Sequence, residues 1–336
     1  SVAPSLADAM GIPRTHLPLF VLAAFSASGA AAFPPSSHPR ARRRNAQRVP
    51  PSGDPIRLRG GTAMFGATRT QFLARIGGAV LSLPLLTEVY SRAGASRLAP
   101  GGRFPSDPLA DPATGWDEVE DVTLVFHGAG GQDQYTDELM KNLEAPRGRG
   151  GKSYEALVDW SAVSGNILQA SFNGQRVGRE TASLLLSKLR YRNGTPGEER
   201  NKCNTVHVIG ISVGAFAADS CVTQIKKVLG TRANEVNVQL TLLDPFLQRG
   251  VIGVGYGTKT FGRSADYAQQ YMNTDDPVPS TNDPCTNCAC VDVTALRPKE
   301  IFGHDWPLVY YARSRQLGIV PLEQRQEAGS VVVAKK

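Results

Sequence analysis

Short, almost uninterrupted apolar runs recur along this chain of 336 residues, and they constrain its fold more than any other feature. Each run is as long as a buried strand, and helix-compatible segments separate the runs. Strands that are apolar on both sides must be covered on both faces, which favours a parallel sheet between two layers of helices. The sequence therefore predicts an α/β fold with a mostly parallel sheet. The runs are 121–126, 155–160, 205–210, 237–243 and 268–272.

Three segments carry helical signals. Apolar residues recur at helical spacing between residues 167 and 189, a small-residue segment covers 215–228, and 306–316 forms the closing helix. Right-handed crossovers between parallel strands place all strand carboxyl ends at one sheet edge, where ligands bind in such folds. Functional residues are therefore expected directly after the strands.

The positive charge of the chain is concentrated at one end of the sequence. There are 37 Lys plus Arg and 30 Asp plus Glu, a formal net charge of +7. Residues 1–95 hold eleven arginines and three acids and carry +8, so residues 96–336 carry −1. A basic folded domain would favour an acidic partner such as nucleic acid. Because the surplus lies in 1–95, no nucleic-acid partner is expected.

Residues 1–95 have the composition of a targeting presequence. The apolar run 17–25 followed by Ala30-Ala-Ala32 is typical of a secretory signal peptide. Phe33 stands directly after the expected cut and opens an Arg-rich, acid-poor stretch typical of a transit peptide. This combination resembles the bipartite presequence of algae with complex plastids.

A third targeting signal is predicted before residue 96. Thr68-Arg-Thr-Gln-Phe-Leu-Ala-Arg75, the apolar 76–86 and Ala93-Gly-Ala95 resemble a thylakoid-lumen signal of the twin-arginine type, with Thr70 in place of the second arginine. The prediction is a presequence over 1–95, a single folded domain over 96–336, and a thylakoid-lumen destination in the plastid. The alternatives are that 76–86 is a core helix or an anchor, and that the protein is secreted.

Gly210-Ile-Ser-Val-Gly214 lies between a strand and a helix. Glycines at both ends of this motif allow a tight turn in which Ser212 adopts a strained conformation and exposes its hydroxyl at the sheet edge. The motif predicts a nucleophilic serine. The alternative is a tight strand–helix turn without catalytic function.

A serine nucleophile needs a base, and 96–336 contains three histidines. His207 lies inside a strand and is interpreted as a core residue, whereas His127 precedes a glycine-rich loop that it is expected to shape. His304 follows all five runs, in agreement with the order Ser…Asp…His of hydrolase folds. His304 is therefore the predicted base.

Two aspartates are candidates for the acid that orients this histidine. Asp244 ends the fourth run and Asp276 follows the fifth, and spacing does not choose between them. The oxyanion hole needs two backbone N–H groups. We expect them from Val213, after the serine, and from Ala129, in the loop after the first run.

At these residues the sequence resembles pancreatic-type triacylglycerol lipases of the α/β-hydrolase superfamily. Residues 205–218 are similar to that family's nucleophile strand and helix, and Val158-Asp-Trp160 to its preceding strand. Leu240-Thr-Leu-Leu-Asp-Pro245 is similar to the strand that ends in its acid, so the resemblance favours Asp244. The chain departs from the family in having Ile211 before the serine and in lacking a clear lid and the C-terminal β-sandwich.

The cysteines cluster in Cys285-Thr-Asn-Cys288-Ala-Cys290. An oxidising lumen favours a disulfide within this loop, and Cys203 with Cys221 is a conceivable second pair. A structural zinc site would need four ligands, and no second Cys/His pair has suitable spacing. Neither a metal nor a cofactor is expected.

Together these features predict a serine hydrolase of carboxylic esters, a lipase or esterase acting on an acyl lipid or small ester. A thylakoid membrane surface or membrane complex is a candidate partner. The alternative is a hydrolase-fold protein retained as a non-catalytic luminal subunit or scaffold of a thylakoid membrane complex, because a fold alone does not establish a function.

Overall fold

A computed structural model describes six segments of the chain. The chain divides into two compact units, Ser1–Phe72 and Leu73–Lys336, and every described residue belongs to the second. Apart from 85–93, the segment assigned to the presequence lies outside the described residues, and so does the expected domain boundary at residue 96. The described segments are 85–93, 107–112, 115–144, 152–190, 203–314 and 316–335.

The described residues form a seven-stranded sheet in which all strands are parallel, in the order β2-β1-β3-β4-β5-β6-β7. The five predicted strands are present, although β2 begins and ends two residues earlier than expected. Strand β3 occupies a central position and is buried along its whole length. The strands are β1 Asp121–Phe126, β2 Ser153–Val158, β3 Thr205–Ile211, β4 Asn237–Leu243, β5 Tyr267–Met272, β6 Ala289–Asp292 and β7 Val331–Val333.

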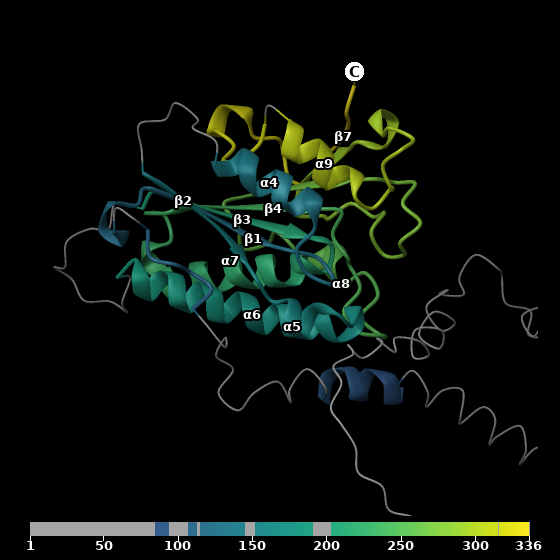
Figure 1. The fold of residues 1–336 in the computed structure, drawn as a ribbon, viewed down its shortest axis with the longest axis horizontal. Coiled ribbons are helices and arrows are strands. Elements are labelled where there is room, and N and C mark those ends of the chain that lie inside the picture. Colours follow the sequence, from purple (N-terminus) through teal and green to yellow (C-terminus); the bar gives the residue numbers. More distant parts are fainter. Residues whose placement is uncertain are drawn as a thin grey trace, which may run out of the picture. The chain divides into compact units, whose positions relative to one another are not determined.

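Helices cover both faces of the sheet, with α6 and α7 on one face and α4 and α9 on the other (Figure 1). This arrangement confirms the predicted α/β fold with a parallel sheet. The helices are α4 Gln134–Glu144, α5 Ser161–Ser164, α6 Ile167–Lys188, α7 Ala215–Leu229, α8 Tyr256–Thr260 and α9 Trp306–Arg313. Single 3-10 turns are η2 Trp116–Glu118, η3 Ser212–Gly214, η4 Gly230–Arg232, η5 Thr294–Leu296 and η6 Leu322–Gln324.

Helices α6 and α7 pack closely because α6 presents a glycine to its neighbour. A Cβ added to Gly178 would lie 2.0 Å from the Ala217 carbonyl oxygen. Helix α6 begins after Asn166, whose side chain accepts hydrogen bonds from the N–H groups of Leu168 and Gln169. This close packing holds α7, and with it the turn after β3, against the sheet.

A helix at residues 85–93 contacts the loop after β4 through one buried acid. Glu88 is 2% exposed, and its Oε2 accepts a hydrogen bond from the Val251 N–H at 2.6 Å. The Arg92 Nε donates to Glu88 Oε1 at 2.9 Å. The sequence assigns this helix to the presequence, so cleavage before residue 96 would leave the Val251 N–H without this acceptor.

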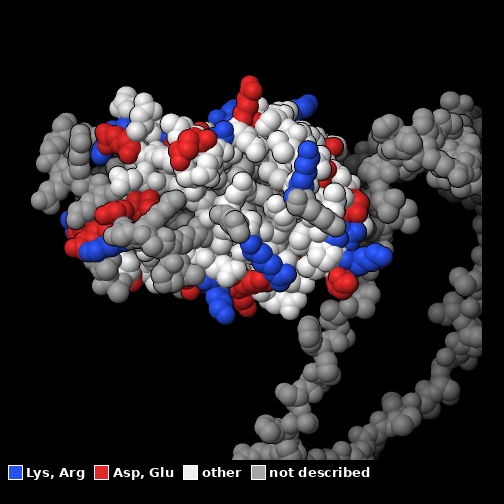
Figure 2. Space-filling model, turned by 90° about the horizontal axis from the view of Figure 1, so that it is seen from above, with Lys and Arg blue, Asp and Glu red and all other residues white. Residues whose placement is uncertain are grey.

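The described surface carries charges of both signs. On the face seen in Figure 2, basic and acidic side chains lie interspersed over a largely uncharged surface. Among the described helices, none combines the length and apolarity needed to cross a membrane.

The expected disulfides are absent from the structure, in which all five cysteines are buried thiols. In strand β6, Cys290 Sγ lies 3.3 Å from Gln270 Oε1 and 3.5 Å from the Cys288 carbonyl oxygen. Cys288 Sγ lies 3.9 Å from the Phe261 carbonyl oxygen. The thiols therefore hydrogen-bond to nearby oxygens in place of pairing, which corrects the expectation for residues 285–290 and for Cys203 with Cys221.

Candidate active site

The predicted site residues meet at the carboxyl edge of the sheet, where the strand order reverses between β1 and β3. In parallel sheets such a reversal opens a crevice above the strand ends. Ser212 follows β3 and Asp244 follows β4, and paired register keeps these ends level, with Ile211 opposite Leu243. Asp276 lies in the loop after β5, and His304 lies two residues before α9.

Ser212 stands on a strained turn, as the glycine spacing predicts. Its φ is 52°, in the left-handed region that side chains disfavour. A Cβ on Gly210 would lie 2.8 Å from Ala215 Cα, and one on Gly214 would lie 2.4 Å from the Phe126 carbonyl oxygen. Both flanking positions therefore have room only for glycine, which explains the motif physically.

The base candidate lies within hydrogen-bond distance of the serine. His304 Nε2 is 2.9 Å from Ser212 Oγ, although 92 residues separate them in the chain. The loop that carries His304 is held by Asn273, whose Nδ2 donates to the Gly303 carbonyl oxygen at 2.9 Å. The His304 side chain is 18% exposed and is therefore only partly accessible to solvent.

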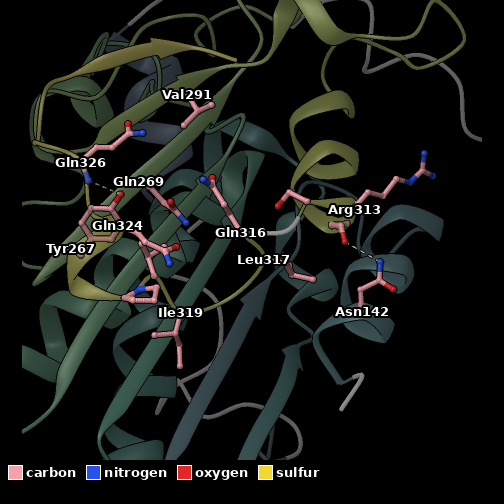
Figure 3. Close-up of a pocket in the computed structure, with 14 residues that line it drawn as sticks. Asn142, Tyr267, Gln269, Val291, Arg313, Gln316, Leu317, Ile319, Gln324 and Gln326 are labelled. Carbon is pink, nitrogen blue, oxygen red and sulfur yellow. Dashed lines mark hydrogen bonds between the residues drawn. The ribbon is translucent and has the colours of Figure 1, made fainter. Parts of the chain in front are cut away.

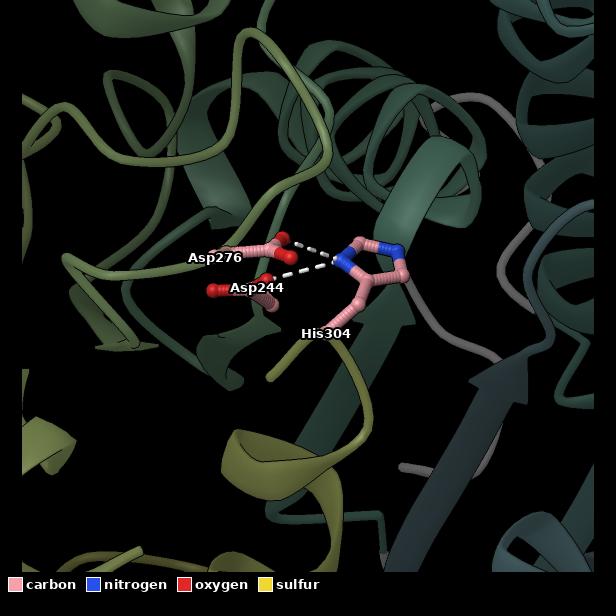
Figure 4. A group of neighbouring side chains, drawn as sticks. All are labelled: Asp244, Asp276 and His304. Carbon is pink, nitrogen blue, oxygen red and sulfur yellow. Dashed lines mark hydrogen bonds and ion pairs between the residues drawn. The ribbon is translucent and has the colours of Figure 1, made fainter. Parts of the chain in front are cut away.

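Both acid candidates contact the same imidazole nitrogen. His304 Nδ1 lies 2.7 Å from Asp244 Oδ2 and 2.8 Å from Asp276 Oδ2 (Figure 4). Because carboxylate oxygens accept hydrogen bonds, Nδ1 carries a hydrogen, and in the neutral imidazole Nε2 faces the serine hydroxyl as an acceptor. The sequence did not choose between Asp244 and Asp276, and in the structure both lie within hydrogen-bond distance of His304.

The surroundings shift the pKa values of all three groups. Burial lowers the pKa of His304, but hydrogen bonds and charge from Asp244 and Asp276 outweigh it and raise that pKa to about 9. Burial raises the pKa of Asp244 above its ordinary value, and the neighbouring Asp276 raises it further. For Asp276, burial also raises the pKa, but hydrogen bonds from His304, Asp244 and the Val278 N–H outweigh it and lower the pKa. The two carboxyl groups therefore differ in their tendency to ionise.

The loop after β1 lies against the serine. A Cβ added to Gly128 would lie 3.3 Å from Ser212 Cβ. Ala129, the next residue, is exposed, whereas Val213 is fully buried at the start of the turn into α7. The two residues expected to supply oxyanion N–H groups therefore lie on segments that border Ser212.

The other two histidines of the domain lie in structural positions. The Trp160 N–H donates to His127 Nε2 at 3.1 Å, and His127 Nδ1 lies 2.8 Å from the Gly128 carbonyl oxygen, so His127 shapes the loop after β1. His207 is fully buried in β3, with Nε2 2.8 Å from Thr241 Oγ1. These positions agree with the roles expected for the two histidines.

Asp244, Asp276 and His304 also form a group of ligand types suited to a metal ion. The spacing argues for direct hydrogen bonds, because His304 Nδ1 lies within 2.8 Å of each acid. Tetrahedral zinc with bonds of about 2.0–2.1 Å needs ligand atoms roughly 3.3 Å apart. A metal would therefore have to spread the three side chains.

A separate cavity of about 620 Å³ lies beside the carboxyl end of α9 (Figure 3). Amide side chains dominate its polar lining, among them Gln269, Gln316, Gln324 and Gln326. Neither Ser212 nor His304 lines it. The cavity is therefore distinct from the candidate active site at the strand ends.

Two residues, Asn273 and Thr281, support the acids and His304 and were not predicted from the sequence. The Asn273 N–H donates to Asp244 Oδ1 at 3.0 Å, while its side chain holds the His304 loop. Thr281 Oγ1 donates to Asp276 Oδ2 at 2.8 Å. The position of Asn273 directly after a strand is a weak signal of such a role. Neither residue spacing nor composition indicates the contact between Thr281 and Asp276.

The geometry of these residues carries the functional interpretation. No family model matches the chain, and no curated protein matches it.

Proposed function

We propose that the protein is a serine hydrolase of carboxylic esters with an α/β-hydrolase fold. One observation carries the proposal: Ser212 Oγ lies 2.9 Å from His304 Nε2, while His304 Nδ1 contacts Asp244 and Asp276. A hydroxyl, an imidazole and an acid in this order form the constellation that activates a serine. The strained φ of Ser212 and its position after a central parallel strand add support.

The reaction follows from these contacts. Ser212 Oγ forms a bond to the ester carbonyl carbon, and its proton passes to His304 Nε2. Backbone N–H groups of Val213 and Ala129 stabilise the negative oxygen that develops. The bond to the leaving alcohol then breaks, and Nε2 returns the proton to the alcohol oxygen. A water molecule attacks the acyl-enzyme by the same proton transfers and releases the carboxylic acid.

The acids keep the imidazole in the productive tautomer. An acceptor at Nδ1 leaves Nε2 free to take the serine proton and stabilises the imidazolium that forms. Asp244 is the acid that the sequence resemblance favours, and Asp276 is the alternative. Both positions agree with this role in the structure, because each lies within 2.8 Å of Nδ1.

An acyl lipid is the proposed substrate class, and the plastid, with the thylakoid lumen as the destination, is the proposed location. The resemblance of 205–218 and 240–245 to pancreatic-type lipases supports the first, and the composition of residues 1–95 supports the second. A thylakoid membrane surface is the corresponding partner. The alternatives are a small ester as the substrate and secretion as the destination.

The second candidate function is a non-catalytic luminal subunit or scaffold of a membrane complex. Its support is the low exposure of the proposed nucleophile, since Ser212 is 7% exposed and Ile211 beside it is 8% exposed. In this alternative the strained turn would be a packing feature of the fold.

Labelling with a fluorophosphonate probe separates the two functions. The wild-type chain is expected to react covalently at Ser212, and Ser212→Ala is expected to abolish labelling. Ser183→Ala is the matched control, because Ser183 lies on α6 and its hydroxyl donates to the Arg179 carbonyl oxygen. A wild-type chain that does not label under conditions in which known serine esterases label fully would contradict the enzymatic proposal.

A further inference from the structure

Two carboxyl groups converge on one nitrogen, although a serine–histidine pair needs a single acid. Asp244 and Asp276 reach His304 Nδ1 from two loops, after β4 and after β5 (Figure 4). Both carboxyl side chains are almost fully buried, at 1% and 0% exposed. One carboxylate oxygen of each acid and one imidazole nitrogen all lie within 4.8 Å of one another. Two buried anions at this separation repel each other, which favours one ionised and one protonated carboxyl group.

The neighbouring donors show which carboxyl group is better suited to a negative charge. Asp276 accepts hydrogen bonds from Thr281 Oγ1 at 2.8 Å and from the Val278 N–H at 3.0 Å. Outside the three-residue group, Asp244 accepts from the Asn273 N–H at 3.0 Å. Hydrogen bonds to a carboxylate favour its ionised form. The donor sets therefore favour charge on Asp276 and the proton on Asp244.

We infer that Asp244 and Asp276 both position His304 and hold a single proton between them, with Asp276 as the carboxylate and Asp244 as the carboxylic acid. The Asp244 hydroxyl donates to Asp276, and His304 Nδ1–H donates to the pair. The pair then carries one negative charge, as a single acid would. The inference deepens the proposed function and rests on it only for its catalytic consequence.

A shared proton makes the two acids interchangeable. When Asp276 is replaced by a neutral residue, its repulsion no longer adds to the effect of burial on Asp244. The hydrogen bond and charge of His304 then favour the Asp244 carboxylate, so Asp244 ionises and takes over the charge. When Asp244 is replaced, Asp276 already carries the charge. Removing both leaves Nδ1 without an anion. Other acids that act on this group are Asp305, which interacts with His304 and Asp276, and Asp133, which interacts with Asp305.

The test uses the full chain with four sets of substitutions: Asp244→Asn, Asp276→Asn, the double variant, and Asp275→Asn as the matched control. Asp275 precedes Asp276 but pairs with Arg297 at 3.0 Å. Asparagine keeps an oxygen for the backbone N–H donors. If an asparagine variant loses the wild-type spectrum, the serine variant at that position replaces it, with the same expected result.

The first readout is nuclear magnetic resonance, which does not depend on catalysis. Carboxyl ¹³C shifts are expected to show the Asp244 carboxyl still protonated at neutral pH in the wild-type chain and ionised there in Asp276→Asn. The ¹⁵N titration of His304 is expected to stay near the wild-type value in each single variant and in Asp275→Asn. It should fall toward the ordinary histidine value only in the double variant. An Asp244 carboxyl that keeps its proton in Asp276→Asn would overturn the inference.

The second readout is the rate of fluorophosphonate labelling at Ser212. Each single variant is expected to stay within about 10-fold of wild type, and the double variant to slow by about 10³–10⁴-fold, the loss typical of a triad without its acid. A single variant as slow as the double variant would identify one working acid and overturn the inference. If the wild-type chain does not label, the proposed function fails, and the magnetic-resonance readout still decides whether the acids share a proton.

Discussion

Ser212 and Asp244 are the two residues of the proposed site with a strained backbone. Their φ angles are 52° and 45°, and each stands directly after a buried parallel strand. At this point the chain must leave the strand and present a side chain above the sheet edge. A residue held in this region costs roughly 1–3 kcal/mol, which persists only where the surrounding fold compensates. Both strained residues contact His304 through hydrogen bonds, which supports a functional origin of the strain.

The raised pKa of His304 predicts an alkaline pH dependence. Nε2 accepts the serine proton only when the imidazole is neutral, and Asp244 and Asp276 raise the pKa to about 9. Below this pKa, kcat/KM for a soluble ester is expected to fall about 10-fold per pH unit. The measurement is kcat/KM between pH 6 and 10, corrected for ester hydrolysis without enzyme. A plateau already reached at pH 7 would contradict the prediction.

At the scale of elements, the contact between α6 and α7 decides whether the turn that carries Ser212 is held rigidly. Helix α7 continues directly from that turn, and α6 buries it on one side through Gly174 and Gly178. A Cβ on Gly174 would lie 3.2 Å from the Ala217 backbone nitrogen. The close packing of α6 against α7 therefore helps to fix the position of the turn that carries Ser212.

Gly178→Ala is expected to destabilise the protein. The added methyl would lie 2.0 Å from the Ala217 carbonyl oxygen, so the two helices must separate, at a cost of about 1–3 kcal/mol in the free energy of unfolding. Urea unfolding followed by circular dichroism measures the change. Gly165→Ala is the matched control, since nothing lies within 4 Å of a Cβ there and its φ of −67° suits alanine. Equal stability of the two variants would contradict the role given to Gly178.

For the whole molecule, helix 85–93, which the sequence assigns to the proposed presequence, contacts the loop after β4. Glu88 is almost fully buried and accepts from the Val251 N–H and, at 3.4 Å, from the Ile252 N–H. The same nine residues belong to the segment that the sequence assigns to the third targeting signal. Cleavage before residue 96 would therefore remove an acceptor that the precursor provides.

Removal of residues 1–95 is expected to speed amide hydrogen exchange at Val251 and Ile252 by about 10-fold or more, because exchange follows the opening of protecting hydrogen bonds. The comparison is between a chain that starts at residue 73 and one that starts at residue 96, with β4 as the internal reference. Glu88→Ala in the longer chain is expected to reproduce the effect. Unchanged exchange in both cases would contradict the contact.

Much of this architecture could be predicted from local pattern. The strands β1, β3, β4 and β5 bury nearly every residue, so uninterrupted apolar runs reveal them. Strand β6 is four residues long and half-buried, and all three residues of β7 are exposed, so neither carries a periodic signal. Helix α4 is amphipathic but directly follows a glycine-rich loop, and it is not among the helices predicted from the sequence.

The sequence by itself determined the α/β fold, the candidate nucleophile and the candidate base, because apolar runs, a glycine-flanked serine and histidine order are local properties. Only the tertiary structure decided the relation of the two acids. Asp244 and Asp276 lie 60 and 28 residues from His304 in the chain, and they meet at Nδ1 because neighbouring parallel strands end at the same edge. The tertiary structure also decided that all five cysteines are thiols. Whether two sulfur atoms lie close enough to pair depends on packing, which the spacing of cysteines in the sequence does not encode.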